Sequence, residues 1–182
     1  MLQIRQIEID SDDNELVKRV KLFLPIKVGD NIFFRVSRIK KGILSVFPEI
    51  KEISIKRQIV RGGVLFSLTS RQPLAQIIEG DSVKGVDKEG KIFPLFSRYE
   101  VQLPEICNST NNLVQMMSFL DWLKNGHLLV FQKIRKVFTE ENGNLVLMLN
   151  DGTKISWGDL NFNEEKLHNL GTVLNDLVKR NK

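Results

Sequence analysis

The sequence predicts an α+β fold in two domains, residues 1–72 and residues 73–182. The first part alternates strand patterns with two amphipathic helix patterns, whereas short strand patterns separated by turn residues dominate the second part. Charge divides the chain similarly, because residues 1–80 hold 14 Lys and Arg against 9 Asp and Glu, and the rest holds 13 of each. The whole net charge of +5 therefore lies in the first part.

The composition, with 42% hydrophobic and 27% charged residues, is that of a globular protein. No apolar stretch approaches the ~18–20 residues that cross a bilayer, and the N-terminus lacks the features of a signal peptide. We therefore expect no membrane span and no export signal within this sequence.

The first domain is expected to hold three strands and two helices. Its predicted strands are 4–9, 53–56 and 64–69, and its predicted helices are 15–24 and 36–47. Apolar residues recur at helical spacing in both helices, which end before Pro25 and Pro48. The last two strands flank Gly62-Gly63, which favours a hairpin. Two helices can then cover one face of a three-stranded sheet.

The second domain is expected to be a β-sheet with flanking helices. Its predicted strands are 75–78, 83–86, 92–94, 130–138, 145–149 and 154–157. A helix is predicted at 112–124 and another at 164–179, each with leucines on one face. The last strands form an antiparallel meander whose final turn is Asn150-Asp151-Gly152.

Residues typical of catalysis are scarce. Cys107, His127 and His168 are the only cysteine and histidines, so the sequence predicts no disulfide, no metal site and no cofactor. A hydrolase that uses Cys107 with His127 is kept as an alternative. Asp87 and Asp151 each precede a glycine within a turn, and we interpret both as turn residues rather than as an acidic catalyst or a cation ligand.

A second alternative is nucleic-acid binding through the basic first domain. The basic residues available for phosphate contacts are Arg35, Arg38, Lys40, Lys41, Lys51, Lys56, Arg57 and Arg61. However, we expect Phe23, Phe33 and Phe47 to belong to the core, so stacking aromatic side chains would not lie among these charges. Nucleic acid and small molecules are therefore not the expected ligands, although a general protein-interaction module stays open.

Several motifs, taken in order, resemble the FtsQ/DivIB family of bacterial cell-division proteins. They are Gly29-Asp30-Asn31-Ile32-Phe33, Phe47-Pro48-Glu49-Ile50, Arg71-Gln72-Pro73-Leu74-Ala75, Val86 to Phe93, Leu103-Pro104 and Leu147 to Gly158. The resemblance implies a polypeptide-transport-associated (POTRA) domain at 1–72, a family-specific β domain at 73–182, and a scaffold without catalysis. The implied partners are other divisome proteins at the septum, such as FtsB- or FtsL-like proteins and the division transpeptidase.

The resemblance leads us to expect a transmembrane helix before Ile4 and a final strand after the last helix, and neither lies within the sequence given. A location on the extracytoplasmic face of the inner membrane is therefore expected if an anchor precedes Met1.

Two surfaces are predicted to carry the function. Residues 153–157 are expected at an unpaired edge of the meander, where they could hold a partner by strand addition. These residues are Thr153, Lys154, Ile155, Ser156 and Trp157. The basic helix with Arg35, Arg38 and Lys41 could lie close to anionic lipid headgroups.

Overall fold

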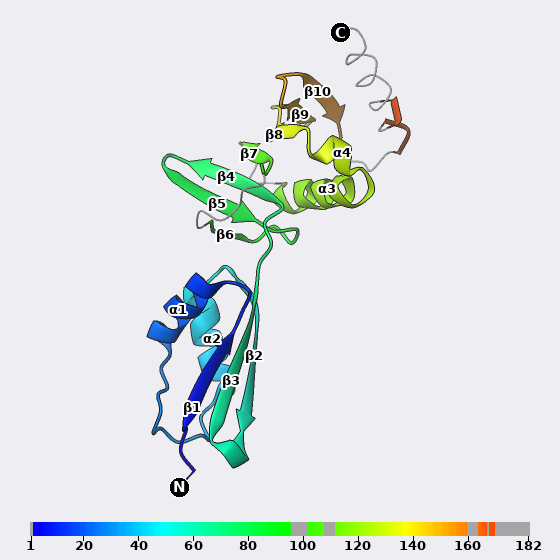
Figure 1. Cartoon of the computed structure of the whole chain (residues 1–182). Coiled ribbons are helices and arrows are strands. Elements are labelled where there is room, and N and C mark those ends of the chain that lie inside the picture. Colours follow the sequence, from blue (N-terminus) through cyan, green and yellow to red (C-terminus); the bar gives the residue numbers. More distant parts are fainter. Residues whose placement is uncertain (1, 96–101, 108–111, 160–163, 167, 170–182) are drawn as a thin grey trace. The chain divides into compact units, whose positions relative to one another are not determined.

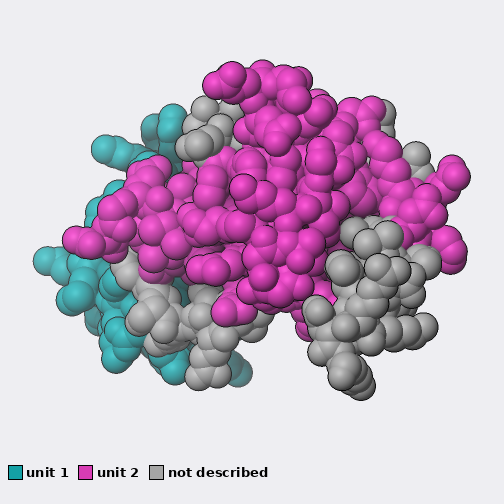
Figure 2. All heavy atoms as spheres, turned by 90° about the horizontal axis from the view of Figure 1, so that it is seen from above, with its two compact units in different colours: residues 1–72 teal, residues 73–182 magenta. Residues whose placement is uncertain are grey.

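The computed structural model describes residues 2–95, 102–107, 112–159, 164–166 and 168–169. The chain divides into two compact units, Met1–Gln72 and Pro73–Lys182, which Figure 2 distinguishes by colour. Each unit combines a sheet with helices, which confirms the predicted α+β class. No helix in the described ranges is both long and apolar enough to cross a membrane.

Unit 1 (residues 1–72) is a three-stranded sheet with two helices (Figure 1). Its elements are β1 (Gln6–Asp10), α1 (Asn14–Phe23), α2 (Val36–Val46), β2 (Ile50–Gln58), the short helix η1 (Ile59–Arg61) and β3 (Gly63–Ser70). The strand order is β1-β3-β2, with β1 parallel and β2 antiparallel to the central strand. The predicted helices and hairpin are therefore present.

Local chemistry explains how α1 begins and how both helices pack. The Asp13 carboxylate accepts the N–H groups of Glu15 and Leu16 at 2.9 and 3.0 Å, which is an N-cap. Leu16 and Val20 of α1 join the sheet residue Phe66 in one buried cluster. Ile39 and Ile43 of α2 are in the same cluster, so both helices cover one face of the sheet.

The structure corrects part of the predicted core. Phe47 is buried, but Phe23 is 41% exposed and Phe33 is 58% exposed. Phe23 is the last residue of α1, and the Phe33 N–H is held by the Asn31 side chain at 2.9 Å in the turn before α2. Phe33 therefore lies in a turn outside both helices, and Phe23 is only partly covered at the end of α1, where its ring centroid lies 5.5 Å from that of Phe47. Leu44, an apolar residue within the predicted helix 36–47, is also 40% exposed.

Unit 2 (residues 73–182) is a mixed seven-stranded sheet of order β10-β9-β8-β7-β4-β5-β6. The strands are β4 (Ala75–Glu79), β5 (Ser82–Val86), β6 (Ile92–Pro94), β7 (Glu105–Cys107), β8 (Ile134–Thr139), β9 (Leu145–Leu149) and β10 (Lys154–Gly158). Two antiparallel meanders, β4-β5-β6 and β8-β9-β10, are joined by β7, which pairs in parallel with β4 and β8. The sequence pattern missed β7, which is as short as the predicted β6 but does not follow a turn motif such as Asp87 to Gly90.

Helix α3 (Leu113–Gly126) supplies the main apolar contacts of the unit 2 core, including Met116, Phe119 and Leu120. A second correction concerns the predicted strand 130–138. Its first residues lie in the short helix α4 (Leu128–Phe131), where the N–H groups of Val130 and Phe131 bond the His127 carbonyl, and β8 begins only at Ile134. Most of the predicted last helix, 164–179, lies outside the described residues, although 164–166 and 168–169 are helical.

Candidate functional site

The outer side of β10 is the first candidate site, because this strand is last in the order of the seven-stranded sheet. Thr153 accepts the Leu149 N–H at 2.9 Å, so the backbone of Thr153 faces β9. Successive residues of a strand point their backbone groups to opposite sides. Lys154 and Ser156 therefore point their N–H and C=O groups away from β9, and no described strand pairs with them.

A tight turn fixes the register of this edge. Asn150, Asp151 and Gly152 connect β9 to β10, and Gly152 has a φ of 86°, which glycine adopts without strain. The Asp151 carboxylate accepts the Thr153 N–H at 2.9 Å. This hydrogen bond to the backbone lowers the pKa of Asp151, and it supports the predicted role of Asp151 as a turn residue.

Aromatic side chains of helix α3 pack against the core-facing side of β10. Trp157 is 4% exposed, and its ring centroid lies 5.1 Å from that of Phe119 and 6.4 Å from that of Trp122. Ile155 also packs against the core, whereas Lys154 and Ser156 are exposed on the other face. The side chain of Trp157 therefore lies in the core and not on the outer side of the predicted edge.

Lys166 covers the end of the β10 edge. Its Nζ donates to the Trp157 carbonyl at 3.2 Å and to Asp159 Oδ1 at 3.0 Å, and lies 5.9 Å from the Trp157 ring. A register shift between Ser156 and Gly158 further bends the strand there. The accessible part of the edge is therefore centred on Lys154 and Ser156.

Two of the three predicted basic residues line a groove in unit 1. Arg35 and Arg38 lie beside a cavity of about 530 Å³, and its apolar lining comes from Phe23, Pro25, Ile26, Phe34 and Ile39. Lys41 is exposed but does not line this cavity. The Arg57 guanidinium stacks over the Phe34 ring at 4.7 Å and donates to the Phe34 carbonyl.

The geometry around Cys107 opposes the hydrolase alternative. The Cys107 Sγ lies 3.3 Å from Glu105 Oε1, and Glu105 forms an ion pair with Lys136 at 2.9 Å. Burial and the bond to Glu105 raise the pKa of the Cys107 thiol. A nucleophilic cysteine needs a lowered pKa. His127 instead lies 3.2 Å from Glu164 and 5.4 Å, between ring centroids, from Trp122.

Asp87 is also a turn residue in the structure. Its carboxylate accepts the N–H groups of Glu89 and Lys91 at 3.0 and 2.9 Å, and Gly90 completes the turn with a φ of 77°. In the part of the chain that the structure describes, no three His, Cys, Asp or Glu side chains are grouped so that they could hold a metal ion.

A family model and a known cell-division protein both match this sequence. The family model described as FtsQ/DivIB, C-terminal related, matches residues 72–182. The cell division protein FtsQ of Corynebacterium glutamicum is 26% identical over 179 residues, which cover 96% of this chain and 79% of that protein.

A solved structure is similar at lower identity. It is the major extracytoplasmic domain of the trans isomer of the cell division protein DivIB from Geobacillus stearothermophilus. The similarity covers 49% of this chain and 79% of that chain, with 11% identity and a TM-score of 0.39.

Proposed function

Because this chain belongs to the FtsQ/DivIB family of cell-division proteins, we propose that it is a non-catalytic scaffold that holds other division proteins at the septum. Its place of action is the extracytoplasmic face of the inner membrane. Unit 1 is a POTRA-like domain, and unit 2 is the β domain that carries the principal partner surface. The partners are division proteins of the FtsB and FtsL type.

The observation that supports this function best is the outer side of β10. The backbone groups of Lys154 and Ser156 point away from β9, in register for an added strand. Strand addition makes backbone hydrogen bonds for affinity, while side chains at alternate positions select the partner. The aromatic cluster behind Trp157 keeps the template rigid, so little ordering free energy is lost when a partner strand binds.

The experiment compares two variants of Ser156. Proline removes the outward N–H and places a ring at the edge, while an edge strand tolerates proline at such a position. Ser156→Pro should weaken binding of an FtsB-like peptide roughly tenfold or more, because one hydrogen bond is lost and strand approach is blocked. Ser156→Ala keeps the backbone donor and should bind like the unchanged protein.

Hydrogen exchange locates the effect. Added peptide should slow exchange at Lys154 and Ser156 in the unchanged protein and in Ser156→Ala. Unchanged protection at these residues in the presence of saturating peptide would contradict the proposal. Equal binding by the proline and alanine variants would contradict it as well.

A further inference from the structure

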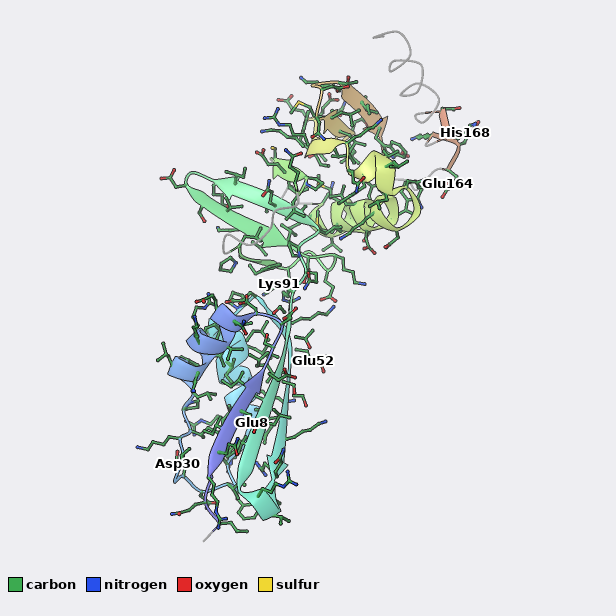
Figure 3. The ribbon with its side chains drawn as sticks, in the orientation of Figure 1. Glu8, Asp30, Glu52, Lys91, Glu164 and His168 are labelled. Carbon is green, nitrogen blue, oxygen red and sulfur yellow. The ribbon has the colours of Figure 1, made fainter. Side chains whose placement is uncertain are left out.

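Three segments of unit 1 meet at one end of its sheet, the end where the N-terminus lies in Figure 1. They are residues 2–5, 27–35 and 56–62. Ile4 donates its N–H to Asp30 and accepts the N–H of Gly29, both at 2.8 Å, and Arg5 donates to the Gly62 carbonyl at 2.7 Å. These bonds fix the segments against one another; Figure 3 labels Asp30 among them.

This end exposes large apolar side chains from all three segments. Val60 is 98% exposed, and Val28 and Phe33 are 60% and 58% exposed. We call the whole set the apolar tip: Leu2, Val28, Phe33, Ile59 and Val60. Single exposed apolar residues are ordinary, but five from backbone-linked segments mark an interaction surface.

The same three segments are strongly basic. They contain six basic residues against one acidic residue, Asp30. The basic residues are Arg5, Lys27, Arg35, Lys56, Arg57 and Arg61. None of them forms an ion pair with a residue of the described ranges, and the Asp30 carboxylate accepts the Lys27 backbone N–H at 2.9 Å. The end of unit 1 therefore presents uncompensated positive charge around protruding apolar groups.

We propose that the apolar tip inserts into the interface of an anionic lipid bilayer. Surface-binding elements combine apolar side chains, which enter the headgroup boundary, with Lys and Arg, which contact anionic headgroups. Val60 is 98% exposed in η1 at the end of the β2–β3 hairpin, and such a protruding side chain suits a deformable lipid surface. This inference concerns unit 1 and does not depend on the β10 edge.

The test is cosedimentation of the full chain with vesicles. Vesicles of equal parts phosphatidylglycerol and phosphatidylcholine should bind the protein at low salt, and pure phosphatidylcholine vesicles should bind it far more weakly. High salt should release most of the protein, because the attraction between exposed charges is screened. Absence of binding to the anionic vesicles at low salt overturns the proposal.

Matched variants locate the contact. The double variant Ile59→Ser, Val60→Ser should weaken vesicle binding about tenfold or more, because two inserted apolar side chains are lost. Leu22→Ser is the control, since Leu22 is 88% exposed on α1 and lies outside the tip. Val28→Ser repeats the test on a second segment if the hairpin variant unfolds. Equal loss in the control, or no loss in the tip variants, contradicts the assigned surface.

Charge variants separate the electrostatic attraction to anionic lipid from the contribution of the apolar side chains. Arg61→Gln should weaken binding about fivefold, the effect of one basic residue near an anionic surface. Lys88→Gln, an exposed lysine in the Asp87 turn of unit 2, should leave binding unchanged. Tighter binding to duplex DNA than to vesicles at the same salt would assign the surface to nucleic acid and overturn the lipid proposal.

Discussion

The two meanders of the seven-stranded sheet end in different outer strands. On one side β6 has three residues and ends in Pro94, whereas on the other side β10 has five residues and no proline. Leu95 donates its N–H to the Val83 carbonyl at 3.2 Å, so the backbone of Pro94 points away from β5. Short strands and proline protect sheet edges from unwanted pairing. Among the residues that the structure describes, the sheet is therefore protected at β6 and open at β10.

The packing behind the two edges differs as well. Phe93 of β6 is buried over Gly85, where an added Cβ would meet its ring at 3.0 Å, but Phe93 lies outside the main core cluster. Trp157 of β10 belongs to that cluster and contacts Phe119 of α3. The open edge at β10 is therefore also the edge with more core packing, as a rigid binding template requires.

The largest expected effect comes from removing the support of β10. Trp157→Ala should lower the free energy of unfolding of unit 2 by about 3–5 kcal/mol, because it leaves a cavity beside Phe119 and Trp122. Urea titration followed by near-UV circular dichroism measures the change, and hydrogen exchange should show β10 opening first.

The control for this substitution is Leu129→Ala, because Leu129 is 78% exposed on α4. Its effect should stay within about 0.5 kcal/mol. A Trp157→Ala protein as stable as this control would show that the aromatic cluster does not support the open edge.

A slightly smaller effect is expected at the joint between the meanders. Ile106 is buried at the centre of β7, which is the strand that connects β4 to β8. Ile106→Ala should cost about 2–4 kcal/mol and should let the two meanders unfold in separate steps. A single unfolding transition with coincident probes on both meanders would show that β7 is not the weak joint of the sheet.

The ion pair between Glu105 of β7 and Lys136 of β8 makes the stability of unit 2 depend on pH. The Lys136 ammonium, bonded to Glu105 at 2.9 Å, lowers the pKa of Glu105 from its ordinary value of 4.5. The stabilisation is therefore complete above pH 4.5 and is lost as the pH falls through the lowered pKa. Both side chains are partly exposed, so Glu105→Gln should cost about 1 kcal/mol at neutral pH.

In Glu105→Gln this acid-dependent loss should disappear. Urea titrations at neutral pH and below pH 4.5 measure the difference between the two proteins. The same acid-induced loss in the variant would assign the pH dependence to other carboxylates.

The elements with clear periodicity could be predicted from the sequence, and those set by local contacts could not. The spacing of Leu16, Val20, Ile39 and Ile43 predicts helix faces that are buried in the structure. The short strand β7 and the one-turn helix α4 offer too few residues for any period. The exposure of Phe33 depends on a hydrogen bond from its N–H to Asn31, which no pattern of apolar residues shows.

At the β10 edge, too, some features could be predicted from the sequence and others depend on contacts seen only in the structure. The turn before β10 was predictable from Asn150-Asp151-Gly152, since these residues suit a tight turn. That Lys154 and Ser156 are the residues with outward backbone groups follows only from the observed bond between Leu149 and Thr153. The apolar tip had no sequence signal, because its residues come from three distant segments.

The smallest expected effect tests whether Pro94 is what protects the β6 edge. Pro94→Thr restores an outward N–H on a strand that is otherwise paired with β5. Stability should change by no more than about 0.5 kcal/mol, since the position faces away from its neighbour. A strand-forming peptide should then slow hydrogen exchange at β6 as well as at β10.

Ile92→Thr is the matched control, because it alters the same strand and keeps Pro94. Peptide protection at β6 in Pro94→Thr but not in Ile92→Thr would mean that the missing donor, and not the shortness of the strand, makes the two edges different. If β6 remains unprotected in both variants, strand length alone distinguishes the edges, since three residues offer at most two outward-facing positions to a partner.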